Sequence, residues 1–239
     1  MQKKILSLAF VLLLALGLLS IALGATSARA ATTQCRGTAI PSGEVVTALY
    51  TSPTCGNTSY NTETLSPIAV GVGLCNEAQS VPSGWVARAI GNSGTCGPNL
   101  EYGNQYILAV PSSGLAICNQ ATSTPSGYVV TAIDNSGNCD VYGEYGNQYT
   151  ITVPRAGLAI CSLATRAPAG YVVTSLYNSG TCDVSLSGGN TYVLALPSNG
   201  QAICDVTAIP AGYHVTSVYN TGNCGTFIGN GGNTYTIAS

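Results

Sequence analysis

The sequence predicts an all-β protein built from five tandem repeats of about 43 residues. The first observation is the spacing of the ten Cys, which follow one another at intervals of 20 to 22 residues, so every second Cys recurs after 40 or 43 residues. The second is that each repeat has a stretch rich in Val, Ile or Thr after a Pro-x-Gly turn, and in repeats 2–5 a turn that begins with Asn follows it, as expected of strands bounded by turns. The third is that no segment after residue 30 has a helical hydrophobic period.

The N-terminal segment has the layout of a secretory signal peptide. Lys3 and Lys4 precede an apolar run from Ile5 to Ala25, and Ala28-Arg29-Ala30 forms an A-x-A cleavage pattern. We therefore predict a signal peptide over residues 1–30. The apolar run is also long enough to span a bilayer, so an uncleaved anchor is the alternative.

The chain after residue 30 carries little charge. It has no Lys, and four Arg against nine Asp and Glu leave five net negative charges. This sparse negative charge disfavours nucleic acid and anionic membranes as partners. No second hydrophobic span is expected after signal cleavage. Ten Cys in an exported chain favour an oxidising location: secreted, at the cell surface or in a periplasm.

We place the repeats at residues 31–74, 75–117, 118–160, 161–203 and 204–239. The typical repeat has a Pro-x-Gly turn, an aromatic residue, a Val-rich strand, an Asn-Ser/Thr-Gly turn before its second Cys, and a Gly-Asn-x-Tyr element. Repeat 1 is an atypical cap, because Glu44 replaces the aromatic residue and residues 59–63 replace Gly-Asn-x-Tyr.

Repeat 3 illustrates the strands that we expect. Residues 128–133 form a β-branched strand after the Pro-x-Gly turn. The stretch 149–153 alternates apolar and polar residues, which predicts that Tyr149, Ile151 and Val153 face inward. After a turn at 154–157, residues 158–161 form a short return strand. Each repeat therefore offers three strands, with room for a short fourth after its second Cys.

Repeats of this size bury too little apolar surface to fold alone and need disulfides or neighbours. Pairing within each repeat is favoured, and each loop of about 20 residues could contribute roughly 3 kcal/mol. The other phase leaves Cys35 and Cys224 to join only in a closed ring. We favour an open array of small β modules, with a closed five-bladed β-propeller as the alternative. The favoured pairs are Cys35–Cys55, Cys75–Cys96, Cys118–Cys139, Cys161–Cys182 and Cys204–Cys224.

The titratable residues do not form a catalytic pattern. His214 is the only His, stands where other repeats have Val, and is expected on the surface of a strand. Acidic residues recur in only two repeats each, and equivalent positions would lie a repeat apart rather than across a cleft. We predict no catalytic residues, no metal site, no cofactor and no enzymatic activity. A calcium site at Asp140 and Glu144 is disfavoured for the same sparseness. The recurring acidic pairs are Glu101/Glu144 and Asp140/Asp183.

The aromatic residues after the Pro-x-Gly turns are the candidate ligand-binding residues. Exposed rings there could stack on sugars, whereas the competing interpretation is that they cover a small core. We expect a non-enzymatic protein that binds glycan or an extracellular protein at or outside the cell surface, with avidity from its repeated sites. The alternative is a self-associating matrix, coat or filament component, and a protease inhibitor or hydrolase is less favoured. The four residues are Trp85, Tyr128, Tyr171 and Tyr213.

Overall fold

The computed structural model describes residues 30–97, 103–139, 146–182, 189–225 and 232–239. Its contacts divide the chain into Met1–Ala31 and Thr32–Ser239, and all the described strands belong to the second unit. No helix within the described ranges is long and apolar enough to cross a membrane.

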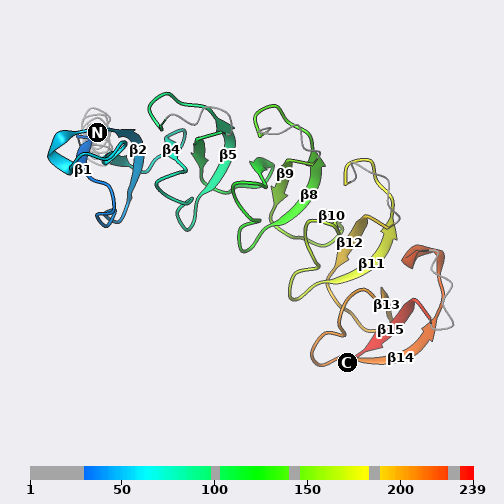
Figure 1. The fold of residues 1–239 in the computed structure, drawn as a ribbon. Coiled ribbons are helices and arrows are strands. Elements are labelled where there is room, and N and C mark those ends of the chain that lie inside the picture. The colour runs from blue at the N-terminus through cyan, green and yellow to red at the C-terminus, as the bar shows by residue number, and fades with distance from the viewer. Residues whose placement is uncertain (1–29, 98–102, 140–145, 183–188, 226–231) are drawn as a thin grey trace, which may run out of the picture. The chain divides into compact units, whose positions relative to one another are not determined.

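The described chain folds into five separate three-stranded antiparallel sheets, one per repeat (Figure 1). In each sheet the third strand lies in the middle, between the strand that ends at the first Cys and the Val-rich strand. The all-β class and the repeated modules are therefore confirmed. The strands are β1 (Thr32–Cys35), β2 (Glu44–Tyr50), β3 (Thr62–Pro67), β4 (Gly73–Cys75), β5 (Val86–Gly91), β6 (Gln105–Ala109), β7 (Leu115–Cys118), β8 (Val129–Asp134), β9 (Gln148–Thr152), β10 (Ala159–Cys161), β11 (Val172–Tyr177), β12 (Thr191–Ala195), β13 (Gln201–Cys204), β14 (His214–Tyr219) and β15 (Thr234–Ala238).

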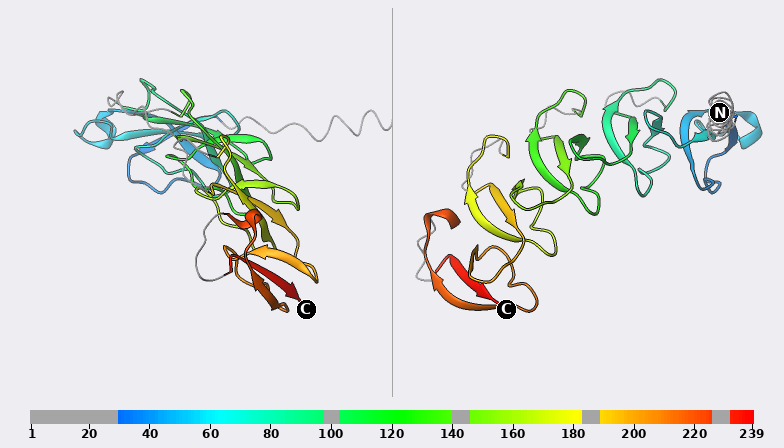
Figure 2. Two further views of the ribbon diagram at one scale, coloured as in Figure 1. Left: turned by 90° about the vertical axis from the view of Figure 1, so that its right-hand side faces the viewer. Right: turned by 180° about the vertical axis from the view of Figure 1, so that it is seen from behind.

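The sheets form an open array. Each sheet has extensive contacts with its neighbours in the chain, and within the described ranges no such contact joins β1–β3 to β13–β15 (Figure 2). The five-bladed propeller is therefore wrong. We call the surface that a repeat turns toward the preceding repeat its front face, and the surface that it turns toward the following repeat its back face.

The five disulfides have the intra-repeat pairing. This pairing excludes the alternative phase and its Cys35–Cys224 link, and five disulfides are typical of an oxidising environment. Each disulfide of repeats 2–5 also fills the junction with the repeat before it. At the first junction, Cys75 and Cys96 pack in one cluster with Val46 and Leu49 of repeat 1. The disulfides thus close each repeat and supply part of its front face.

A β-bulge recurs at the same place in the second strand of every sheet, for example between Val46 and Ala48. A bulge adds one residue to one strand, so two residues three apart can direct their N–H groups to the same edge. The Val46 N–H donates to Gln79 Oε1 at 3.0 Å, and the Leu49 N–H donates to the Thr95 carbonyl at 2.7 Å. The bulge therefore turns a sheet edge into a docking edge for the next repeat.

The expected inward position of Val153 is wrong, because its side chain is 50% exposed. Ile151 is buried and Tyr149 is half-buried, as the alternation predicts. However, β9 ends at Thr152, so Val153 lies beyond the paired part of the sheet, and its N–H donates to Ser113 Oγ at 3.1 Å.

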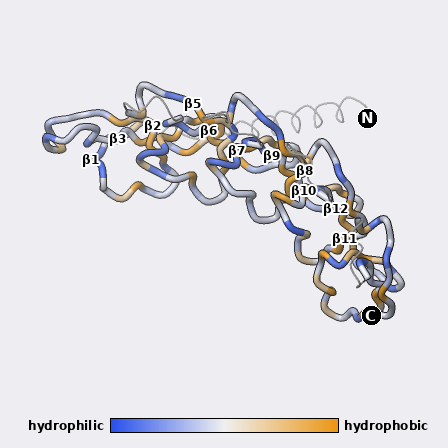
Figure 3. Tube along the Cα trace, turned by 45° about the vertical axis from the view of Figure 1, so that its right-hand side comes forward, coloured by the Kyte–Doolittle hydropathy of each residue, from blue (hydrophilic) through white to orange (hydrophobic). Residues whose placement is uncertain are grey.

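Figure 3 shows hydrophobic residues along strands such as β5 and β8.

Repeat 1 resembles the other repeats more than its sequence indicates. Asn61 is buried and bonds the backbone of Ser52, as the Asn of Gly-Asn-x-Tyr does in the other repeats. Tyr60 stands where those repeats have Gly and adopts a positive φ of 52°.

The first strands of repeats 2–5 begin two or three residues before the Cys at which we started each repeat.

Candidate ligand-binding grooves between repeats

Each candidate aromatic residue is positioned by the turn before it. In repeat 3, Gly127 of the Pro-x-Gly turn has a φ of +82°, which Gly adopts without a steric penalty. The Tyr128 N–H then donates to the Pro125 carbonyl at 3.1 Å, which closes the turn. The same closure recurs at Trp85, Tyr171 and Tyr213, and all four rings are half-buried.

The three tyrosine hydroxyls of this set have structural partners. Tyr128, Tyr171 and Tyr213 donate to the carbonyls of Pro111, Pro154 and Pro197 at 2.9, 3.0 and 3.0 Å, respectively. Their rings also pack against the clusters at the repeat junctions. A ligand can therefore contact the exposed part of each ring, whereas the hydroxyl is already engaged in a hydrogen bond within the protein.

Successive Pro-x-Gly turns form shallow grooves between neighbouring repeats. The groove between repeats 1 and 2 has a volume of about 400 Å³, the next about 580 Å³, and the groove between repeats 4 and 5 about 510 Å³. Trp85 lines both of the first two grooves. The structure therefore brings Trp85, Tyr128 and Tyr171 into a series of grooves that each need two repeats, whereas Tyr213 lines none of the three.

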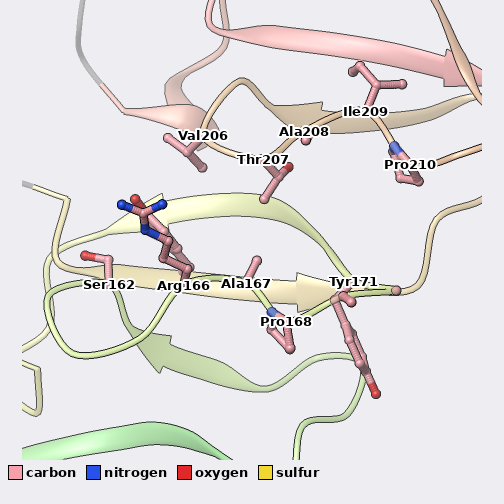
Figure 4. Close-up of a pocket in the computed structure, with 13 residues that line it drawn as sticks. Ser162, Arg166, Ala167, Pro168, Tyr171, Val206, Thr207, Ala208, Ile209 and Pro210 are labelled. Atoms are coloured by element: carbon pink, nitrogen blue, oxygen red, sulfur yellow. The ribbon is translucent and has the colours of Figure 1, made fainter. Parts of the chain in front are cut away.

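The groove between repeats 4 and 5 shows how two repeats contribute (Figure 4). Pro168 and Tyr171 lie on one side, and Thr207 and Ile209 lie on the other (Figure 4). Arg166 also lines this groove and gives it a cationic group.

The groove between repeats 2 and 3 is uncharged throughout its described lining and rich in hydroxyls. Thr122 Oγ1 accepts the Ala87 N–H at 2.9 Å and so helps to hold the two repeats together. Ser83, Ser123 and Ser126 are exposed. Together with the two ring faces, these hydroxyls offer hydrogen bonds and apolar contact to a neutral, polyhydroxylated ligand. The Ser and Thr residues of this lining are Ser80, Ser83, Thr122, Ser123, Thr124 and Ser126.

A second periodic surface feature was missed by the sequence analysis. Val110, Val153 and Leu196 are exposed and occupy equivalent positions in successive repeats. Each directly precedes the Pro whose carbonyl accepts the tyrosine hydroxyl. An exposed aliphatic side chain thus recurs beside each of these aromatic residues. The recurring Val/Leu-Pro pair before each return strand was the available signal.

The remaining candidate residues are not gathered with the grooves. His214 is exposed on β14, as expected for a surface strand residue. Glu101, Asp140, Glu144 and Asp183 lie outside the described residues. In the part of the chain that the structure describes, no three His, Cys, Asp or Glu side chains form a group suited to a metal ion.

Comparisons with protein-family models, with curated proteins and with solved structures gave no match.

Proposed function

We propose that the protein is an exported, non-enzymatic binding protein whose inter-repeat grooves bind neutral polysaccharide at or outside the cell surface. The predicted leader and the five disulfides support the proposed export. The grooves recur along one chain, so an extended polymer could occupy several of them and gain avidity from weak individual sites.

One observation carries the proposal: the groove between repeats 2 and 3 combines two aromatic rings with six Ser and Thr residues and no charged side chain in its described lining. Sugars present apolar ring faces and many hydroxyls, and such a lining matches both. An acidic or basic partner would find no charge complement in this groove.

Trp85 provides a direct measurement of binding. It is the only Trp in the chain and lines two grooves, so its fluorescence reports on ligand at either one. We expect titration with a matching neutral polysaccharide to change the Trp85 emission and to retard the protein in affinity electrophoresis. A panel of neutral polysaccharides that produces neither effect would refute the proposal.

A matched pair of variants tests the location. Ser123→Arg places a long cation in the groove between repeats 2 and 3, whereas Ser59→Arg makes the same change at an exposed residue that lines none of the three grooves. We expect the first variant to weaken binding at least about tenfold, or about 1.4 kcal/mol, and the second to leave it unchanged. Equal effects of the two variants would place the binding site elsewhere.

A further inference from the structure

The back face of repeat 5 is an uncovered copy of a surface that is buried in every other repeat. At the junction between repeats 4 and 5, Val172 and Val173 of β11 are fully buried. The equivalent residues of β14, His214 and Val215, are exposed, and every other residue of β14 is exposed as well. Val218, which occupies the position of the buried Leu49, is 57% exposed.

The front face of repeat 1 is uncovered in the complementary way. The first Cys of repeats 2–5 is fully buried in each case, but Cys35 is exposed, and its partner Cys55 is only half-buried. The Cys35–Cys55 disulfide therefore lacks the Val-rich strand against which the other four disulfides pack.

The existing junctions show how such faces join. Besides the packing of a disulfide against a strand, one backbone bond recurs at the first three of the four junctions. The N–H groups of Leu49, Ile90 and Ile133 donate to the carbonyls of Thr95, Asn138 and Thr181 at 2.7, 2.7 and 2.8 Å, respectively. Each acceptor directly precedes the second Cys of its repeat. The matching groups at the two ends of the chain are the Val218 N–H and the Thr54 carbonyl.

Both end faces have polar residues at positions that are apolar or aromatic in the internal junctions. Internally, Val172 packs in one cluster with Ile203 and with the half-buried Tyr235. The equivalents of these three residues at the ends are His214 on the back face, and Gln34 and Glu63 on the front face. Gln34 Nε2 donates to Glu63 Oε2 at 3.2 Å. An apolar contact is thus replaced on both sides by polar groups. Glu63 is buried in the single chain, but Gln34 is half-buried, and an imidazole N–H can donate to its amide oxygen.

From this match we propose that the back face of repeat 5 binds the front face of repeat 1 of a second copy. The contact continues the established interface between repeats, with a disulfide packed against Val215 and Val218 and with His214 beside Gln34. Because the two surfaces differ, the contact is heterologous, and repeated addition gives a linear assembly of copies rather than a symmetric dimer.

Side-chain hydrogen bonds from the next repeat are not essential to such a junction. Gln79 and Thr122 accept backbone N–H groups at the first two junctions. Repeat 5 has Ala208 at this position and still docks on repeat 4 through β11 and β13. Repeat 1 has Ala39 at the same position, so its front face lacks this side-chain hydrogen bond just as the front face of repeat 5 does.

Two blocking variants test the proposal in the processed chain. Val218→Asp places a charge on the back face, and Thr38→Asp places one on the front face, where Ala78 packs at the first junction. Both residues are exposed in the single chain, so neither change disturbs a buried contact. Sedimentation velocity over a range of concentrations measures the species formed.

We expect the unmodified protein to form a concentration-dependent series of oligomers, and each variant alone to remain monomeric. An equimolar mixture of the two variants should form dimers, because one partner keeps a free front face and the other keeps a free back face. An unmodified protein that is monomeric up to millimolar concentration would overturn the proposal. A Thr38→Asp or Val218→Asp variant that dimerises alone would also overturn it, since that result indicates a symmetric contact.

The control is Ser59→Asp, an exposed change outside both end faces, which should assemble as the unmodified protein does. Ser123→Arg, which blocks a polysaccharide groove, should also assemble normally. Assembly and polysaccharide binding therefore fail independently, and either proposal can be rejected without the other.

Discussion

The side chain of Asn104 forms hydrogen bonds with both the backbone N–H and the backbone carbonyl of Ser93. Asn104 Oδ1 accepts the Ser93 N–H at 2.7 Å, and Nδ2 donates to the Ser93 carbonyl at 3.0 Å. The same two bonds join a buried Asn to the turn before the second Cys in all five repeats. In repeats 2–4 this turn also carries the carbonyl that accepts a backbone N–H of the preceding repeat, so there the Asn positions both the disulfide and the junction. The other pairs are Asn61–Ser52, Asn147–Ser136, Asn190–Ser179 and Asn233–Thr221.

Replacing Asn147 by Ala should destabilise the protein, because the buried Asn side chain is the partner of the Ser136 N–H and carbonyl. Loss of a buried hydrogen-bond partner costs about 1–3 kcal/mol in the free energy of unfolding. Urea denaturation followed by circular dichroism measures this loss. Asn57→Ala, at an exposed position, is the control. Similar midpoints for the two variants would show that the Asn bonds contribute little.

Gly189 is expected to tolerate substitution poorly, because its φ is +73°. A Cβ in this left-handed region costs about 1–2 kcal/mol. Gly180 lies in the neighbouring turn without a positive φ, and a Cβ there meets no atom within 4 Å. Gly189→Ala should therefore lower the thermal midpoint and Gly180→Ala should not. Equal shifts in a thermal melt would contradict the conformational explanation.

An interior disulfide should stabilise the protein more than the terminal one. The Cys118–Cys139 and Cys35–Cys55 loops span 21 and 20 residues, so loop closure contributes nearly the same to both, about 3 kcal/mol. Of these four Cys residues, only Cys118 and Cys139 are fully buried, and they pack in a cluster with Ile90 of the preceding repeat. Removing them also leaves a void, which adds about 1 kcal/mol or more.

The comparison uses two double variants, Cys118→Ala/Cys139→Ala and Cys35→Ala/Cys55→Ala, in guanidinium denaturation. We expect the interior variant to unfold at the lower denaturant concentration. If the terminal variant is as unstable as the interior one, the junction packing of the disulfide contributes nothing.

The repeats, the strands and the disulfide pairs could be predicted because each depends on residues within one repeat. The Cys spacing and the turn residues contain that information directly. The position of Val153 could not be predicted, since alternation does not reveal that β9 ends at Thr152. Asn61 was missed because Tyr60, rather than Gly, precedes it in repeat 1.

The grooves and end faces could be predicted only in part, because they depend on pairs of repeats. Three of the four candidate aromatic residues, Trp85, Tyr128 and Tyr171, line the grooves, but the sequence did not show that the three tyrosine hydroxyls bond to Pro carbonyls. Nor did it show that Val172 and Val173 face the next repeat, which makes the exposure of His214 and Val215 informative. Burial by a neighbouring repeat is a property of the array and not of one strand.

The hydroxyl of Tyr171 should matter for stability and not for ligand binding. Tyr171→Phe removes its bond to the Pro154 carbonyl and should cost about 0.5–1.5 kcal/mol. Tyr177→Phe, at an exposed tyrosine, should cost less. The polysaccharide affinity of Tyr171→Phe should equal that of the unmodified protein. A tenfold loss of affinity without a loss of stability would assign the hydroxyl to the ligand instead.

Amide hydrogen exchange should distinguish a covered back face from the uncovered one. The Ile133 N–H of β8 is bonded across a junction to the Thr181 carbonyl, whereas the equivalent Val218 N–H lies on the exposed β14. Amides in covered junctions exchange only through larger unfolding events, while amides at exposed edges exchange by local fluctuation.

In the monomeric Thr38→Asp variant, we expect the Val218 amide to exchange at least about a hundredfold faster than the Ile133 amide. In the unmodified protein, raising the concentration should slow exchange at Val218 and leave Ile133 unchanged. Exchange at Val218 that is slow in the monomer would show that its own repeat already protects this edge.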